Sequence, residues 1–274
     1  MRKEMFSHEI NILRDTYRRL LRRKAKTNII KLTRKTHPAD LAILFRHFSL
    51  EEQIEIFTLM NENEHTAEFL TELDDSLVND LLSNEKLERI ASIIEKAPTS
   101  DQSGILNTLE EEKAQSVIEL LNVDEQEEIA EIMGYPEDSA GSLMNTEVFT
   151  LHESITAGEA IKTLQDQEDA EMVFYLYITD DDDRLVGVIS LRILTTTPPT
   201  TTLKDIMTKN VHTIRPETDQ EEVARIVAQY NFLAVPVVDS ESHLLGIVTV
   251  DDVVDVIREE ATEDFLQMAG AGKD

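Results

Sequence analysis

Apolar residues recur at helical spacing along residues 37–134, in short segments separated by polar turns. In the first segment Leu41, Leu44, Phe45 and Phe48 stand three or four residues apart, which is the spacing of one helix face. Helices this short are not stable alone in water, so they must stack on their neighbours. The pattern therefore predicts an α-helical superhelix over this stretch.

The segment before it, residues 1–36, has an apolar stripe of its own. Ile10, Leu13 and Tyr17 recur at helical spacing, which predicts one helix over residues 5–35. The opposite face carries Arg14, Arg18, Arg22 and Arg23. Two interpretations are open: a docking helix with a hydrated basic face, or contact with an acidic surface or anionic lipid.

After Gly134 the pattern changes to short β-rich runs, and part of the sequence occurs twice. Residues 143–156 align with residues 206–219, and the run containing Gly187 aligns with the run containing Gly246. Each copy predicts a strand, a helix, two strands joined by a turn, and a closing helix. Two such β-α-β-β-α units are expected to pair around a pseudo-twofold axis.

Charge is unevenly distributed along the chain. The sequence has 26 basic and 55 acidic residues, a net charge of −29. Residues 1–35 hold 12 basic and three acidic residues, which is +9, so the remainder carries −38, the difference between the two values. The acidic excess excludes nucleic acid as a partner, because phosphate binding needs a basic surface. It favours a partner that brings positive charge, such as a metal ion.

Composition excludes other classes of site. There is no Cys, so neither a disulfide nor a thiolate metal site can form. No apolar run reaches the ~18–20 residues that a membrane-spanning helix needs. Neither a nucleophile–base pair nor a glycine-rich phosphate loop is evident, so the chain is not predicted to be an enzyme.

The helix that follows the second β-rich run is the most acidic element. Asp252 and Asp255 stand three residues apart, and Glu260, Glu263 and Asp264 extend the acidic pattern. Like charges at this spacing repel each other on a helix. The surface is therefore either hydrated or a place where cations bind, and the sequence pattern leaves both interpretations open.

The repeats carry a motif that resembles a known domain. Gly246, Thr249 and Asp252 fit the Gly-h-h-Ser/Thr-x-x-Asp ending of cystathionine-β-synthase-type (CBS) domains, whereas the first copy has Ile193 at the Asp position. Further motifs resemble the cytosolic half of the MgtE family of magnesium transporters. They are YPEDSAGSLM (135–144), GVISLR (187–192), TDQEEVARI (218–226), AVPVVD (234–239) and GIVTVDDVVDVIREEATED (246–264).

The resemblance implies an α plus α/β fold, in which a superhelical N domain precedes a tandem CBS pair. It implies a homodimer on the cytoplasmic face of the membrane, joined at its C-terminal end to a transmembrane domain that this chain does not include. Mg²⁺ bound between the domains would close the pore when cellular Mg²⁺ is sufficient. The expected regions are 1–36 (basic helix), 37–134 (N domain), 135–202 and 203–262 (CBS domains), and 263–274 (start of the connecting helix).

The resemblance also implies a set of acidic Mg²⁺ ligands. They are Asp219, Glu221, Asp252, Asp255, Glu260, Glu263 and Asp264, with Asp101 in the N domain. The family expects another acid where this chain has Asn231, so a site there is weaker or absent. Mg²⁺ takes oxygen ligands and keeps several waters, which suits one or two carboxylates from each side of an interface. The alternative for Asp219 is helix capping, which does not exclude metal binding.

A nucleotide site is the runner-up interpretation. CBS pairs often bind adenosine ligands, and the resemblance places Tyr175, Ser190, Arg192 and Phe232 around ATP. Ile193 removes the ribose acceptor of the first copy, at a loss of ~1.5–3 kcal/mol for each charge-assisted hydrogen bond. The alternative to a Mg²⁺ sensor is thus an adenine-nucleotide-binding CBS module.

Overall fold

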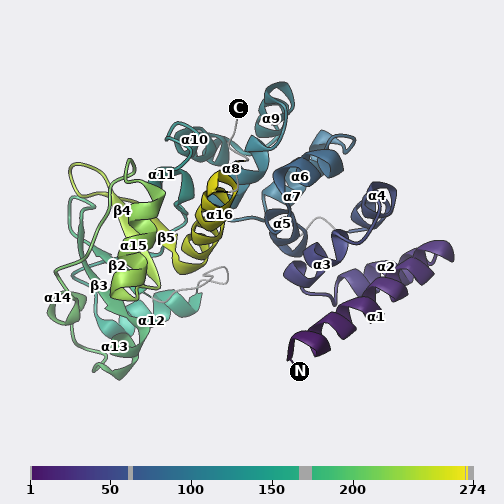
Figure 1. The fold of residues 1–274 in the computed structure, drawn as a ribbon. Coiled ribbons are helices and arrows are strands. Elements are labelled where there is room, and N and C mark those ends of the chain that lie inside the picture. Colours follow the sequence, from purple (N-terminus) through teal and green to yellow (C-terminus); the bar gives the residue numbers. More distant parts are fainter. Residues whose placement is uncertain (1, 61–63, 167–174, 269, 271–274) are drawn as a thin grey trace. The chain divides into compact units, whose positions relative to one another are not determined.

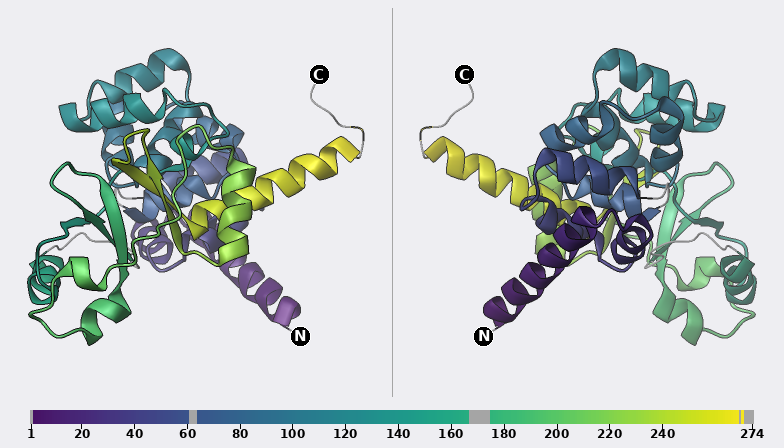
Figure 2. Two further views of the ribbon diagram at one scale, coloured as in Figure 1. Left: turned by 90° about the vertical axis from the view of Figure 1, so that its left-hand side faces the viewer. Right: turned by 90° about the vertical axis from the view of Figure 1, so that its right-hand side faces the viewer.

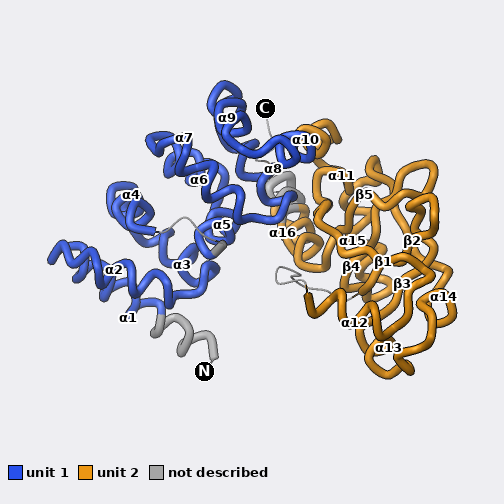
Figure 3. The backbone as a smooth tube through the Cα atoms, turned by 180° about the vertical axis from the view of Figure 1, so that it is seen from behind, with its two compact units in different colours: residues 1–129 blue, residues 130–274 orange. Residues whose placement is uncertain are grey.

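The computed structural model describes residues 2–60, 64–166, 175–268 and 270, and only the backbone of residues 2–9, 64, 259, 263, 264 and 266–268. The chain forms two compact units, residues 1–129 (unit 1) and 130–274 (unit 2) (Figure 3). Each unit is described by itself. Within the described ranges, no helix is both long and apolar enough to cross a membrane.

Unit 1 is built from short helices, and α10 continues past its end. The helices are α1 (Arg2–Arg22), α2 (Lys26–Thr33), α3 (Pro38–Phe45), α4 (Leu50–Thr58), α5 (Glu64–Thr71), α6 (Asp75–Leu82), α7 (Leu87–Ile94), α8 (Thr99–Asn107), α9 (Glu111–Ile118) and α10 (Val123–Ile132).

The helices of unit 1 stack in succession around one apolar core (Figure 1). Helix α5 contacts both α3 and α7, and α7 contacts α9, so alternate helices lie side by side. Leu41, Leu44, Phe45 and Phe48 are all buried in this core, as their spacing predicted. The predicted helical superhelix is confirmed, because the short helices cover their apolar faces on one another in a stacked series.

Basic side chains stabilise the ends of helices in unit 1. Arg89 donates to the carbonyl of Phe57 at 2.8 Å, and Lys113 donates to the carbonyl of Leu82 at 2.6 Å. These carbonyls lie at the C-terminal ends of α4 and α6, where helical carbonyls lack intrahelical partners. A cation there also interacts favourably with the helix dipole.

The single helix predicted over residues 5–35 is wrong, because the structure has two helices there. Helix α1 ends at Arg22, Lys24 adopts a left-handed conformation with φ of 50°, and α2 begins at Lys26. Helix α2 folds back on α1 and covers Tyr17, which is fully buried with its hydroxyl 3.4 Å from that of Thr33. The fold-back shields apolar surface that one continuous helix would leave open to water.

Unit 2 alternates short strands with helices. Its elements are α11 (Ala140–Leu143), β1 (Thr150–His152), α12 (Ala157–Asp166), β2 (Tyr175–Thr179), β3 (Leu185–Ser190), α13 (Leu191–Thr196), α14 (Leu203–Ile206), α15 (Gln220–Tyr230), β4 (Ala234–Val238), β5 (Leu244–Thr249) and α16 (Val250–Met268).

The two copies of the repeat form separate small sheets. In the first, β1 pairs in parallel with β2, and β2 pairs antiparallel with β3. In the second, β4 pairs antiparallel with β5. The first strand predicted for this second copy is reduced to Ile214, whose N–H donates to the carbonyl of Pro236 at 3.0 Å. Both copies otherwise follow the predicted order, so the tandem β-α-β-β-α fold is confirmed.

The two copies exchange their leading segments. Asn145 bridges to Ile247 on β5, and Thr208, its counterpart in the second copy, bridges to Val188 on β3. This reciprocal pairing is the pseudo-twofold relation expected from the internal repeat. It also explains Gly246, where an added Cβ would lie 2.7 Å from the carbonyl oxygen of Asn145.

The two hairpins also use the same turn. Asp239 Oδ1 accepts hydrogen bonds from two backbone N–H groups, including that of His243 at 2.8 Å, and Ser242 has φ of 73°. At the equivalent positions of the first copy, Asp180 caps the turn and Asp183 has φ of 57°. The interpretation of residues 180–183 as a turn with acidic side chains is therefore confirmed.

Helices α15 and α16 pack against each other beside the second sheet. Val223 and Val227 of α15 belong to the same buried cluster as Val253 and Val256 of α16. Figure 2 shows that the C-terminal half of α16 extends beyond α15. These two helices carry most of the acidic residues predicted to bind metal.

Candidate functional site

Asp219 caps the N-terminus of α15. Its Oδ1 accepts a hydrogen bond of 2.9 Å from the backbone N–H of Glu221, which satisfies a helix-end donor. The capping interpretation made from the sequence is thus confirmed. Both residues are exposed, and Asp219 retains a second carboxylate oxygen for another ligand.

A hydrogen bond between helices brings Glu260 to this capped end of α15. The side chain of Gln220 is 7% exposed, and its Nε2 donates to Glu260 Oε1 at 2.7 Å. Gln220 lies between Asp219 and Glu221 in the chain, so this bond joins Glu260 of α16 to the N-terminal end of α15. Sequence reasoning missed Gln220, although its spacing to Val223 and Val227 places it on the buried helix face.

Asp252 occupies the first turn of α16 and is bonded to Thr249. Its Oδ2 accepts from the Thr249 backbone N–H at 2.9 Å and also from the Thr249 hydroxyl. Burial raises the pKa of Asp252 to about 6, and the charges of Asp251 and Asp255 add to the rise, although the bonds from Thr249 oppose it. Ionisation of Asp252 in the folded protein therefore costs free energy, and a bound cation would reduce that cost.

Asp255 lies one turn further along α16 on the protein surface. It forms an ion pair of 2.9 Å with Arg258 on the same helix, and both side chains are about 70% exposed. A surface pair of this kind contributes little to stability. The pair therefore leaves the Asp255 carboxylate accessible to a competing cation.

The described acids do not form one compact metal centre. Asp252 and Glu260 are eight residues apart, which is ~12 Å along a helix axis. In the described part of the chain, no three His, Asp or Glu side chains are grouped closely enough to hold an ion together. The donor set consists of carboxylates, which are the hard oxygen ligands that suit Mg²⁺ when water completes its shell.

Three predicted ligands belong to unit 1 or have side chains outside the described residues. Asp101 lies in unit 1, half-buried in the first turn of α8, where an acid complements the helix dipole. The side chains of Glu263 and Asp264 lie outside the described residues, although the backbone there is part of α16.

Asn231 has a structural explanation. It ends α15 in the left-handed conformation, with φ of 54° and ψ of 44°, and its N–H donates to the carbonyl of Val227. Asn adopts this conformation more readily than most residues. The backbone conformation at the end of α15 therefore accounts for an Asn at this position.

Two of the four predicted nucleotide residues are directly opposite each other. Tyr175 on β2 and Ser190 on β3 are partners in the strand register, so their side chains are on the same face of the sheet. The Ser190 hydroxyl accepts from the N–H of Ile193 at 3.4 Å and caps α13, while Arg192 is exposed. Ile193 packs against the apolar core of the first copy, which accounts for an apolar residue there.

The fourth nucleotide residue, Phe232, belongs to an aromatic cluster. Its ring stacks on Tyr230 with centroids 5.4 Å apart, and the His212 ring lies 5.5 Å from that of Phe232. Tyr230 is 46% exposed. Sequence reasoning left His212 without a role, and no spacing in the sequence links it to residues 230–232. Phe232 packs against the buried cluster of the second copy, whereas Tyr175 is on β2 of the first copy.

Comparison with known proteins agrees with this architecture. Residues 36–138 match the MgtE intracellular N domain, and residues 140–197 and 203–259 match the CBS domain. The magnesium transporter MgtE of Thermus thermophilus is 37% identical over 236 residues, which is 85% of this chain and 52% of the relative. The MgtE of Bacillus subtilis is 31% identical over 250 residues, 86% of this chain and 52% of the relative.

A solved structure is similar over nearly its whole length. The crystal structure of the cytosolic domain of the Mg²⁺ channel MgtE in complex with ATP is 34% identical, with a TM-score of 0.84. The match covers 89% of this chain and 99% of that structure. These relatives are named as magnesium transporters and as a Mg²⁺ channel, and none of these names is that of an enzyme.

The matches show which part of the full-length relatives this chain covers. The chain spans about half the length of the curated relatives, 52% in both cases. The helical unit matches their N domain, and the repeats match their CBS pair in the same order. The chain belongs to the MgtE family and comprises its intracellular N domain and its pair of CBS domains.

Proposed function

We propose that this chain is the cytosolic Mg²⁺-sensing region of a magnesium transporter or channel. Acidic side chains on α15 and α16, together with Asp101 of the N domain, take up Mg²⁺ and thereby favour the closed pore. The observation that carries the proposal is the Gln220–Glu260 hydrogen bond, which joins Glu260 of α16 to the end of α15 where Asp219 and Glu221 stand.

Electrostatics supply the proposed switch. Two like charges ~4 Å apart repel by about 4 kcal/mol at an effective dielectric constant near 20. With −38 outside residues 1–35, such repulsion opposes any compact arrangement of the acidic parts. Bound Mg²⁺ replaces repulsion with attraction, and it shifts the conformational equilibrium only as far as it binds the closed state more tightly.

The proposal includes the location and the partners of the chain. It lies on the cytoplasmic side of a membrane, joined at α16 to a transmembrane domain, and it functions as a homodimer. Helix α16 supports a second copy as partner, because Val254, Ile257 and Phe265 are 40%, 47% and 66% exposed. They stand on one side of the helix, and an exposed apolar stripe marks a surface that binds another protein.

Small-angle X-ray scattering tests the proposed switch. Adding Mg²⁺ at constant ionic strength should reduce the radius of gyration of the wild-type chain. The double variant Asp252→Asn, Asp255→Asn should lose most of this compaction. The matched variant Asp181→Asn, Asp183→Asn removes the same charge from the β2–β3 turn and should keep it. Equal compaction in all three proteins would refute the assignment of Asp252 and Asp255.

A second candidate function is adenine-nucleotide binding by the CBS pair. The Tyr175–Ser190 register pair favours it, and the similar MgtE cytosolic domain was crystallised with ATP. Ile193→Asp restores the acidic acceptor of the motif. If the cleft of the first copy binds a nucleotide, this variant should bind ATP more tightly than the wild type in a calorimetric titration. Absence of ATP binding by both proteins would exclude this function.

A further inference from the structure

The α1–α2 hairpin carries a basic surface that the proposed magnesium sensor does not use. Residues 1–35 have a net charge of +9, although the rest of the chain carries −38. The basic surface is defined here by Arg19, Arg22, Arg23, Lys24 and Lys26, which are all exposed. They occupy the last turn of α1 and the turn into α2.

Neighbouring arginines on α1 have structural partners, and this sets the basic surface apart. Arg14 pairs with Asp15 at 3.0 Å, and Arg18 donates to the carbonyl of His47 at 2.7 Å. Within the part of the chain that the structure describes, the side chains of Arg19, Arg22 and Arg23 form no hydrogen bond or ion pair. Their side chains are therefore available for a ligand outside unit 1.

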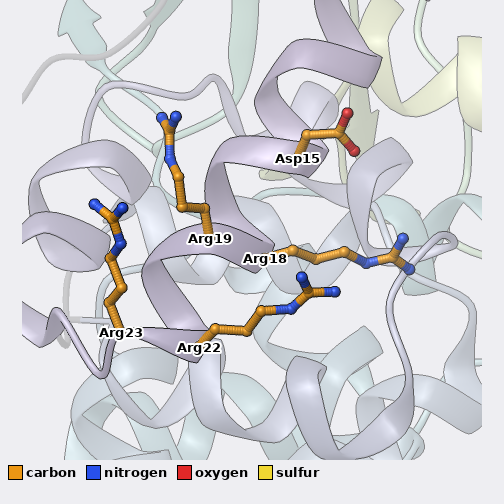
Figure 4. Close-up of a pocket in the computed structure, with 5 residues that line it drawn as sticks. All are labelled: Asp15, Arg18, Arg19, Arg22 and Arg23. Atoms are coloured by element: carbon orange, nitrogen blue, oxygen red, sulfur yellow. The ribbon is translucent and has the colours of Figure 1, made fainter.

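These guanidinium groups surround an open hollow of about 400 Å³ lined by Asp15, Arg18, Arg19, Arg22 and Arg23. In Figure 4 the side chains of Arg19 and Arg23 extend in one direction, and that of Arg22 extends toward Arg18. The one acid of the lining, Asp15, is already neutralised by Arg14. The hollow is consequently a site of concentrated positive charge, and guanidinium groups bind phosphate oxygens in pairs.

We propose that this basic surface docks unit 1 on a bilayer that contains anionic phospholipids. The proposal rests on the proposed function, which puts the chain beside a membrane. Lipid phosphates fit because the cations spread over a helix end and the following turn and do not converge on one enclosed point. Nucleic acid fits poorly, because the chain has no Trp and only 5% aromatic residues for base stacking.

The acidic remainder of the chain does not prevent such docking. The Debye length is about 10 Å at 0.1 M salt, so charges further than this from the bilayer are largely screened. Each cation that reaches an anionic surface contributes roughly fivefold to binding. Loss of three such cations should therefore weaken binding roughly 100-fold.

Vesicle sedimentation tests the proposal with the full chain. The probes are vesicles of equal parts phosphatidylglycerol and phosphatidylcholine, and vesicles of phosphatidylcholine alone, both with EDTA present. The test variant is Arg19→Gln, Arg22→Gln, Arg23→Gln. The matched control is Arg46→Gln, Lys86→Gln, Lys96→Gln, which removes three exposed cations elsewhere in unit 1.

The wild type and the control should bind the phosphatidylglycerol vesicles alike, and the test variant should bind roughly 100-fold more weakly. None of the proteins should bind phosphatidylcholine. The proposal is overturned if the wild type does not bind, if it binds both vesicles equally, or if the control loses as much affinity as the test variant. It is also overturned if the test variant loses only self-association in sedimentation velocity, which would assign the basic surface to the acidic face of a second copy.

Two further measurements separate this proposal from the proposed function. Circular dichroism should show the same helix content in the test variant, since the three side chains are exposed. Calorimetric titration with Mg²⁺ should give the same isotherm in the test variant as in the wild type. Vesicle binding without a Mg²⁺ isotherm would reject the sensor and keep the docking surface, and the reverse result would reject the docking surface alone.

Discussion

Asp252 closes the first turn of α16 by accepting hydrogen bonds from both the backbone N–H and the hydroxyl of Thr249. At the equivalent place in the first CBS copy, Ser190 caps α13 and Ile193 replaces the acid. The two copies therefore begin the same helix with different hydrogen bonds: an acidic side chain accepts from Thr249 in the second copy, and the Ser190 hydroxyl accepts from the Ile193 N–H in the first. The buried carboxyl group of Asp252 makes the stability of the chain depend on pH.

The free energy of unfolding of the metal-free chain should contain a term that falls as pH rises from about 4 to 6. Burial raises the folded-state pKa of Asp252 from 3.8 to about 6, so the folded state holds its proton over this range more tightly than the unfolded state. The stabilising term is complete below the unfolded pKa and is lost as pH passes through the folded pKa. Its size should be about 1–2 kcal/mol after allowance for partial exposure to solvent. Thermal melts of the wild type minus those of Asp252→Asn, at each pH, isolate this term from other carboxyl groups.

Asp252→Asn should raise the free energy of unfolding of the metal-free chain at pH 7 by about 1–2 kcal/mol, because a neutral amide avoids a buried charge. The amide oxygen can still accept from the Thr249 N–H. The same variant should gain less stability from added Mg²⁺ than the wild type gains. Asp255→Asn is the control, and it should change stability by less than about 0.5 kcal/mol because its ion pair is exposed. Denaturant unfolding with and without Mg²⁺ measures both effects, and a less stable Asp252→Asn protein would contradict the account.

The hydrogen bond between α15 and α16 should be a larger contributor to stability than the charge of Glu260. Gln220→Ala removes a buried donor and should cost about 1–2 kcal/mol. Glu260→Gln retains an acceptor for Gln220 and should cost less. In contrast, Glu260→Gln should weaken Mg²⁺ binding directly. Chemical unfolding ranks the two variants, and an equal or greater loss in Glu260→Gln would show that the helix contact depends on charge.

Gly246 and Gly187, which contact the exchanged segments, should differ in their tolerance of an added methyl group. An added Cβ at Gly246 would lie 2.7 Å from the backbone carbonyl of Asn145, whereas at Gly187 the nearest atoms, at 2.5 and 2.7 Å, belong to the Met207 side chain. A methionine side chain can move more easily than backbone. Gly246→Ala should therefore be destabilised by about 1–3 kcal/mol and Gly187→Ala by less. The reverse order in thermal melts would contradict the exchanged arrangement of the two copies.

Most of the fold could be predicted from periodicity, and the failures have local causes. The helices of residues 37–134 were predictable because each has one apolar face. The break between α1 and α2 was not, because Lys24 adopts a left-handed conformation without a glycine or proline to signal it. The first strand of the second copy was expected in full, but only Ile214 pairs with β4. Such a short pairing depends on tertiary contacts more than on strand propensity.

The candidate site was predictable in part. The cap formed by Asp219 followed from an acid at a helix start, and the structure confirms it. The Gln220–Glu260 bond joins residues 40 positions apart, and a single sequence carries no signal for such a pairing. Whether these acids bind metal remains a prediction, because carboxylates at helical spacing are compatible with hydration as well as with Mg²⁺.

Isothermal titration calorimetry with Mg²⁺ tests the central claim most directly. Ionic strength is held constant with NaCl, so that screening alone produces no signal, and the proteins are the wild type, Asp219→Asn with Glu260→Gln, and the Asp181→Asn, Asp183→Asn control. The wild type and the control should show the same saturable binding in the millimolar range, and the Asp219–Glu260 variant should lose most of it. An isotherm that is the same in all three proteins, or no saturable heat in the wild type, would contradict a Mg²⁺ site on α15 and α16.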